Sequence, residues 1–392
     1  MAAVMSGVAL YVGLNPALQR RVELDRLAVG SVNRAQSSTV GIGGKGQGAY
    51  VAALQLAEAE AATNPDNGGL LHPQLCMFLG EGREGDALRE FLLEQSSASG
   101  QLAEQLWTRV SAPVRICTTL VEASTGDATE IVEPAGTVSS TEWADLLDSI
   151  RRRHGEEQPK GGIAAIGILG TMPPGVPPDG YSQILRQVCG PRTKVLIDSL
   201  VDVRCTLSVA SECVHAGDVH AAGGNIAGGG IILKLNAREI LGLTGRSIQG
   251  SDSQVAADLD VVTQACMDLA TEISAMTTNG GTGVDFICFT DGPFPAGVVS
   301  IRSRRRWRLE RTKALRAKVV SPIGAGDATS AGTLHAWCRG VNSGEPVSED
   351  SVVQAFRFGF AVGAASCLHG KNAVFTMADV QDIYEAITVT EC

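Results

Sequence analysis

The sequence of 392 residues has few aromatic side chains, 4% of the total, and fewer basic than acidic residues. Its 32 lysines and arginines stand against 42 aspartates and glutamates, so the formal net charge is −10. This balance argues against a general binder of nucleic acid or of anionic membranes, because both attract positive charge. No apolar run is long enough to span a bilayer, and no signal or transit peptide is expected. We therefore expect a soluble, cytoplasmic protein.

Cysteine pairs of the CxxC type are also missing, although the chain contains ten cysteines. Single thiols scattered through apolar segments favour reduced, buried cysteines over a disulfide framework. Cys205, Cys213, His215 and His220 lie near one another in the sequence. Their spacing matches no zinc pattern, so we favour ordinary loop residues over a metal site.

Short apolar runs alternate with helical patterns along most of the chain. Buried strands are predicted at 8–14, 163–169, 195–197, 231–235 and 286–290, and a helix at 48–60. Such βα units predict a parallel sheet covered by helices on both faces. Two β-prone stretches without helices, within about 14–40 and 110–135, predict a small separate sheet. Low-complexity segments at 57–73, 215–230 and 277–283 predict loops.

The strongest chemical signal is Gly324-Ala325-Gly326-Asp327, followed by small residues that suit a helix. The first amides of a helix have no intrahelical partner and carry partial positive charge, so this turn can stabilise a developing phosphate charge. Asp327 beside it could take a proton from an attacking hydroxyl. An aspartate that only caps the helix is the equally weighted alternative.

A second glycine-rich segment contains Gly41, Gly43 and Gly46 at the spacing of a dinucleotide fingerprint. The match is weak, because the fingerprint should follow the first strand of a βαβ unit, with an acidic residue about twenty positions later. A P-loop is excluded, because Gln47 stands where its lysine should be. Lys45 at the start of a helix still favours an anion-binding turn over a purely structural one.

Polar residues follow two further predicted strands. Lys234, Asn236 and Glu239 end one strand, and Thr290 and Gly292 end another. The carboxyl ends of parallel strands are where ligands bind in this architecture. Asn236 and Glu239 could orient waters of Mg²⁺, or Asn236 could simply cap a helix.

Together, these segments resemble the ribokinase-like sugar kinases of the phosphofructokinase-B type, nearest the 1-phosphofructokinase and tagatose-6-phosphate kinase branch. The resemblance spans about residues 8 to 385. The segments that carry it are Asn15-Pro-Ala-Leu18, Val32-Asn-Arg34, Gly43-Gly-Lys-Gly46, Arg115 with Thr129-Glu-Ile-Val-Glu-Pro134, Gly170-Thr-Met-Pro-Pro-Gly-Val-Pro177, Lys234-Leu-Asn-Ala-Arg-Glu-Ile240 and Pro322-Ile-Gly-Ala-Gly-Asp-Ala-Thr-Ser-Ala-Gly332.

The resemblance implies one three-layer α/β/α kinase domain over residues 1–392, with the small sheet as a lid. It implies transfer of the γ-phosphate of ATP, with Mg²⁺, to a hydroxyl of a small sugar phosphate, a ketohexose phosphate being favoured. Asp327 would be the base and Gly324, Ala325 and Gly326 the anion hole. The implied substrate residues are Asn15, Gln19, Gly43, Gly44, Lys45, Gly48 and Arg115, with Lys45 and Arg115 on the substrate's phosphate. Lys234, Asn236, Glu239, Thr290 and Gly292 would bind the nucleotide, with Asn236 and Glu239 reaching Mg²⁺ through water.

Two positions depart from the pattern of this branch. Gln19 stands where an aspartate is usual, and Gly48 where an asparagine is usual. Both usual residues bind acceptor hydroxyls, so the acceptor is the least determined part of the prediction. A catalytically impaired relative that only binds nucleotide or sugar phosphate, and a kinase for another sugar or nucleoside, remain alternatives. The lid could also join two copies of the chain, so a homodimer is expected, with no nucleic-acid or membrane partner.

A basic stretch at 302–311 alternates Trp307 and Leu309 with charges. An edge strand with one solvated face explains this pattern better than a nucleic-acid patch.

Overall fold

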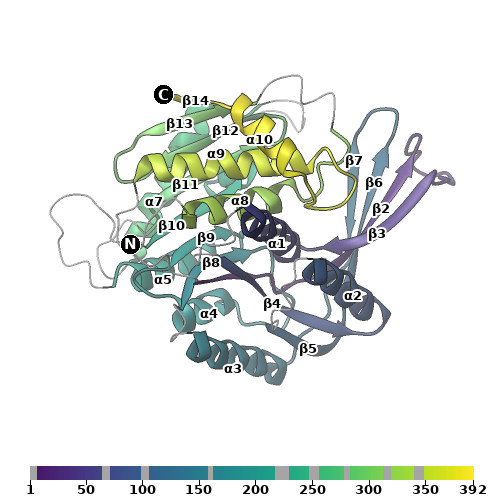
Figure 1. Cartoon of the computed structure of the whole chain (residues 1–392), viewed down its shortest axis with the longest axis horizontal. Coiled ribbons are helices and arrows are strands. Elements are labelled where there is room, and N and C mark those ends of the chain that lie inside the picture. Colours follow the sequence, from purple (N-terminus) through teal and green to yellow (C-terminus); the bar gives the residue numbers. More distant parts are fainter. Residues whose placement is uncertain are drawn as a thin grey trace.

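The computed structural model describes residues 7–63, 71–98, 106–157, 162–216, 229–246, 256–277, 283–311, 319–339 and 348–392. Its largest element is a ten-stranded sheet in the order β14-β13-β12-β11-β10-β9-β8-β1-β4-β5 (Figure 1). In that order the strands are Thr388–Glu391, Arg306–Glu310, Phe294–Ser300, Phe286–Asp291, Gly230–Asn236, Lys194–Asp198, Ile163–Leu169, Gly7–Val12, Leu71–Glu81 and Leu106–Pro113. Strands β11 to β5 run parallel, and β12 to β14 are antiparallel to their neighbours.

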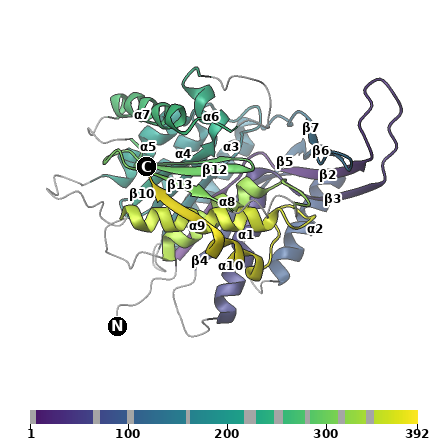
Figure 2. The ribbon, with the colours of Figure 1, turned by 90° about the horizontal axis from the view of Figure 1, so that it is seen from above.

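Helices cover both faces of this sheet, and Figure 2 shows the three layers from above. On one face lie α1 (Lys45–Thr63), α2 (Arg83–Ala98), α8 (Ala325–Arg339), α9 (Glu349–Ser366) and α10 (Met377–Ala386). On the other face lie α3 (Ser140–Glu157), α4 (Gly180–Val188), α5 (Val203–Val214), α6 (Ala237–Leu243) and α7 (Leu259–Met276). Each face has its own apolar core. The central strands are therefore buried on both faces, as their continuous apolar runs predict.

A separate four-stranded sheet, the lid, projects from one end of the molecule (Figures 1 and 2). Its order is β3-β2-β6-β7, from β2 (Ala17–Leu24), β3 (Ser37–Gly43), β6 (Arg115–Glu122) and β7 (Ala128–Val132). Strand β2 runs parallel to β6, while β3 and β7 are antiparallel to their neighbours. The predicted α/β layers and the small second sheet are both confirmed.

Two local predictions need correction. The loop expected over 57–73 is wrong at both ends, because α1 continues to Thr63 and β4 begins at Leu71. Most of the loops expected at 215–230 and 277–283, like His220, lies outside the described residues. Strand β13 has the predicted buried Trp307 and Leu309, but it is not an edge strand, because β14 pairs with it.

The basic residues around β13 form ion pairs with acidic side chains. Arg305 contacts Glu349 and Glu391, and Arg306 contacts Asp260. Paired charges on a sheet surface explain this stretch without nucleic acid. Among the described residues, no helix is long and apolar enough to cross a membrane.

Candidate active site

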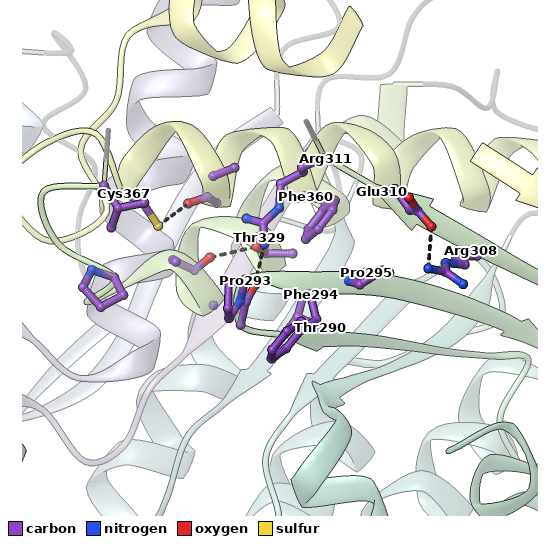
Figure 3. Close-up of a pocket in the computed structure, with 17 residues that line it drawn as sticks. Thr290, Pro293, Phe294, Pro295, Arg308, Glu310, Arg311, Thr329, Phe360 and Cys367 are labelled. Atoms are coloured by element: carbon purple, nitrogen blue, oxygen red, sulfur yellow. Dashed lines mark hydrogen bonds and ion pairs between the residues drawn. The ribbon is translucent and has the colours of Figure 1, made fainter. Parts of the chain in front are cut away.

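Two cavities meet at the N-terminal end of α8. The lid cavity, of about 560 Å³, lies between the lid and the carboxyl ends of the central strands. The hairpin cavity, of about 510 Å³, lies between the β11–β12 turn and α9 (Figure 3). Thr290, Pro322 and Gly326 line both. Two molecules bound in these cavities would therefore approach each other beside the first turn of α8.

The turn before α8 requires glycine at Gly324. Its φ is +78°, and a Cβ there would lie 1.5 Å from Asn372 Oδ1. The amides that follow are only partly available. Ala325 donates its N–H to the Pro322 carbonyl at 3.3 Å, so the prediction that it belongs to the anion hole is not supported by this geometry. The amides of Gly324 and Gly326 make no hydrogen bond to any described residue and stay candidates.

Asp327 lies in the first turn of α8 and lines the lid cavity, with 9% of its surface exposed. Its carboxylate faces α1, where a Cβ on Gly48 would lie 2.5 Å from Oδ2. Burial raises the pKa of Asp327 to about 7, and the nearby charge of Asp198 acts in the same direction, against Lys45 and Lys234. A carboxyl group with such a pKa can accept a proton near neutral pH.

Asp198, which the sequence analysis did not single out, forms hydrogen bonds with three side chains at the site. This buried carboxylate ends β9 and accepts hydrogen bonds from Lys45 Nζ, Lys234 Nζ and Ser330 Oγ, each at 2.8 Å. Although burial opposes it, the two ammonium groups hold the pKa of Asp198 well below its usual range. The sequence feature that could have identified Asp198 is its position directly after the predicted strand 195–197.

Lys45, at the start of α1, already contacts two carboxylates. Besides Asp198, its Nζ lies 3.7 Å from Glu239 Oε1. Against the effect of burial, these carboxylates raise the pKa of Lys45. The side chain still lines the lid cavity and is 38% exposed. Its assignment to the substrate's phosphate stays a prediction.

Asn236 caps α6, as the structural alternative predicted, and Glu239 completes a capping box with it. Asn236 Oδ1 accepts the Glu239 N–H, and Glu239 Oε2 accepts the Asn236 N–H, both at 2.8 Å. Both residues also line the lid cavity, so capping does not exclude binding. Since the capping box uses Oε2 of Glu239, its other oxygen can accept a hydrogen bond from a water bound to Mg²⁺.

Mg²⁺ fits this set of oxygen donors only as an ion that keeps several of its own waters. No group of three or more histidines, cysteines, aspartates or glutamates within the described residues could hold a metal directly. Mg²⁺ bound largely through water and phosphate oxygens agrees with this arrangement. The same finding gives no support for a metal at Cys205, Cys213 and His215.

The other predicted substrate residues separate into those that line the lid cavity and those that do not. Gln19, Gly44 and Arg115 line the lid cavity, and Gln19 Nε2 donates to Thr119 Oγ1 at 2.8 Å. Asn15 instead lines a small neighbouring pocket and donates to Thr171 Oγ1 at 2.9 Å. Gly43 and Gly48 do not line the lid cavity. The backbone of Gly43 packs against Gln19, and Gly48 packs against Asp327. Both glycines therefore contact residues that line the lid cavity.

The hairpin cavity contains the predicted Thr290 and Gly292, together with residues that the sequence analysis did not single out. Figure 3 shows Arg311 crossing this cavity toward Phe360. The guanidinium carbon lies 4.3 Å from the centre of the Phe360 ring, and Nη2 donates to the Gly292 carbonyl. The cavity therefore offers an aromatic face and a cation beside small residues of α9, among them Gly363.

The dinucleotide-fingerprint alternative is wrong. Gly41 and Gly43 lie in β3, which belongs to the lid and runs antiparallel to β2. The fingerprint needs a parallel βαβ unit at this position, and β3 is not part of the parallel sheet.

Comparisons with known proteins agree with this arrangement. The model of the pfkB family carbohydrate kinases matches residues 229–374, which include α8 and the residues that line the hairpin cavity. This region is therefore similar to the pfkB family carbohydrate kinases. A 1-phosphofructokinase of Xanthomonas campestris pv. campestris is 27% identical over 195 residues, 50% of this chain and 53% of that protein. The match thus spans about half the length of that curated relative.

Solved structures extend the likeness to the whole fold. Phosphofructokinase-2 from Escherichia coli, in complex with substrates and products, has a TM-score of 0.68 at 17% identity and covers 97% of this chain and 99% of its own. Ribokinase from Giardia lamblia has a TM-score of 0.64 at 14% identity, covering 96% and 98%. The predicted ribokinase-like fold is therefore confirmed.

Proposed function

We propose that the protein is a sugar kinase that transfers the γ-phosphate of ATP to a hydroxyl of a small sugar phosphate. The observation that carries this proposal is the meeting of two cavities beside a buried carboxylate and unpaired helix amides. ATP occupies the hairpin cavity and the acceptor occupies the lid cavity, so that the γ-phosphate lies near Gly326.

In this mechanism, Asp327 accepts the proton of the acceptor hydroxyl while the hydroxyl oxygen attacks the γ-phosphorus and ADP leaves. The Gly326 amide and the partial positive charge of the α8 N-terminus stabilise the charge on the transferred group. Mg²⁺, when bound, would neutralise phosphate charge, and Asn236 and Glu239 would hold its waters. Thr290 lies where the two substrates meet.

The acceptor's own phosphate is assigned to Arg115, with Lys45 beside it. Both cations line the lid cavity. A ketohexose phosphate is favoured, because the phosphofructokinase resemblance covers these residues. The side-chain amide of Gln19 is held by Thr119. It would form a hydrogen bond with an acceptor hydroxyl or carbonyl, in place of the aspartate that is usual at this position.

A coupled ADP-release assay tests this proposal with fructose 1-phosphate, fructose 6-phosphate, tagatose 6-phosphate and unphosphorylated pentoses. We expect turnover with at least one phosphorylated sugar and a reduction of about 10²–10⁴-fold in kcat for Asp327→Asn. ATP binding without product on any acceptor would instead favour the impaired relative. Turnover restricted to the pentoses would favour a kinase for another sugar.

We also propose a homodimer joined through the lid. Val40, Ile131 and Val132 expose about half of their surfaces on its strands, at 45%, 53% and 52%, and apolar side chains of this kind favour burial in an interface. Phosphofructokinase-2 from Escherichia coli has a tetrameric inhibited form. Light scattering should give the mass of a dimer, and Ile131→Glu should give a monomer.

A further inference from the structure

One side chain joins the lid to the glycine turn before α8. Asn372 lies in the connection between α9 and α10 and lines the lid cavity. Its Nδ2 donates a hydrogen bond to the carbonyl of Ile42 at 3.0 Å. Its Oδ1 packs against Gly324, where a Cβ would lie 1.5 Å from this oxygen. The two ends of one amide therefore contact both sides of the candidate active site.

The contact with the lid is made at the free edge of its sheet. Strand β3 is the outer strand beside β2, and Ile42 is its second-last residue. An outer strand has carbonyls that no neighbouring strand pairs, and Asn372 satisfies one of them. Because a carbonyl only accepts, the amide turns its NH₂ group toward Ile42 and its oxygen toward Gly324.

The backbone around Asn372 is held from two directions. Gln55 of α1 donates its Nε2 to the Ala373 carbonyl at 2.9 Å. On the side of α8, the Ser321 N–H donates to the Cys367 carbonyl at 3.1 Å. The φ of Ala373 is +56°, a conformation that persists in such a residue only where the surrounding contacts hold it. The fold therefore places Asn372, and its side chain transmits that position to the lid.

The oxygen of this amide is buried and accepts no hydrogen bond from any described residue. A buried polar atom without a partner lowers stability. Replacing Asn372 by alanine removes this unfavourable contribution together with the hydrogen bond to Ile42, so the two effects on stability oppose each other. We therefore expect Asn372 to matter more for the geometry of the site than for the stability of the fold.

We propose that Asn372 is a positioning residue that sets the distance between the lid and the glycine turn. The inference rests on the proposed function, in which the acceptor lies against Gln19 and Arg115 of the lid and the γ-phosphate lies near Gly326. The attacking oxygen must then lie about 3–3.5 Å from the phosphorus, and a displacement of about 1 Å reduces the rate by about 10²-fold. Asn372 acts on this distance through its contacts with Ile42 and Gly324.

Steady-state kinetics of Asn372→Ala and Asn372→Asp test the effect on the reaction. We expect kcat to fall by about 10²-fold in both, and the KM for ATP to stay within about twofold of the wild type, since the hairpin cavity is unchanged. The Tm of Asn372→Ala should stay close to that of the wild type. Asn372→Asp keeps the size of the side chain but removes its donor, so it separates the hydrogen bond from the volume. Lys371→Ala changes the exposed neighbouring side chain and should have no effect.

Hydrogen exchange of the unliganded, full-length protein tests the bridge without any substrate. In Asn372→Ala the segment 37–43 of β3 should exchange about tenfold faster than in the wild type, because the edge of the lid loses a hydrogen bond. Lys371→Ala should exchange like the wild type.

Three results would overturn the inference: unchanged exchange of 37–43 in Asn372→Ala, a normal kcat of both variants, or a lower Tm with an unchanged kcat. A wild type that phosphorylates none of the sugar phosphates would instead reject the proposed function. The exchange of segment 37–43 would still show whether Asn372 holds the edge of the lid, so the two failures are distinguishable.

Discussion

Replacing Asp327 by asparagine separates two consequences of burying this carboxylate. The pKa of Asp327 is about 7 in the folded protein, against an ordinary value of 3.8. The folded state therefore keeps the proton to a higher pH than the unfolded chain does. The stability that this group contributes is fully present below about pH 4 and is lost as the pH rises to about 7. A difference of about three pKa units corresponds to about 4 kcal/mol in the free energy of unfolding.

Asparagine has the shape of the protonated acid and carries no charge at any of these pH values. We expect the free energy of unfolding of Asp327→Asn, minus that of the wild type, to increase by about 4 kcal/mol between pH 4 and pH 8. Above pH 8 the difference should stay constant. Urea unfolding at a series of pH values measures it. Asp145→Asn, at an exposed position of α3, is the matched control.

The kcat of the wild type should increase over the same pH range in which the stability contributed by Asp327 falls. If Asp327 is the base, kcat follows its ionised fraction, so kcat should fall about tenfold for each pH unit below 7. The same substitution that stabilises the protein at pH 8 should reduce its kcat by about 10²–10⁴-fold. A stability difference that does not change with pH would refute the burial of this charge. Near-normal turnover of the variant would refute its role as base.

Three further substitutions test neighbouring parts of the site. Asp198→Asn leaves two ammonium groups without their shared carboxylate, so the free energy of unfolding should fall by about 3–5 kcal/mol in urea titrations. Gly48→Ala places a Cβ 2.5 Å from the Asp327 carboxylate, and kcat should fall by about 10–100-fold, while an alanine at Gly155, which has open space, changes nothing. Arg311→Met should raise the KM for ATP about tenfold and leave the acceptor KM unchanged in steady-state assays.

The sequence was sufficient to predict the layers of the fold and the segments that meet at the site. Continuous apolar runs identify doubly buried strands, since a parallel sheet allows no polar face. The run from Gly324 to Asp327 combines a turn that needs glycine with the start of a helix, and both are local features. Local features of this kind can be recognised without knowing which strands are neighbours.

The parts that could not be predicted depend on contacts between distant segments. Asp198 and Lys45 are 153 positions apart, and they meet only because the fold brings the end of β9 to the start of α1. Arg311 reaches Phe360 across a cavity that does not exist in either segment alone. Strand β13 looked like an edge because its partner, β14, is only four residues long and comes at the end of the chain.

The charges around the lid cavity explain why a divalent cation belongs in the proposed reaction. Its walls contain the cations Lys45, Arg115 and Lys234 and four carboxylates, those of Glu130, Asp198, Glu239 and Asp327. Asp198 already holds both lysines. A phosphorylated sugar and ATP would thus add negative charge to a site whose own positive charge is largely neutralised. In such a site phosphate oxygens need an additional cation. Mg²⁺ would supply that charge without removing the lysines from Asp198, so the protein can stay folded around its buried ion pairs while the substrates come and go.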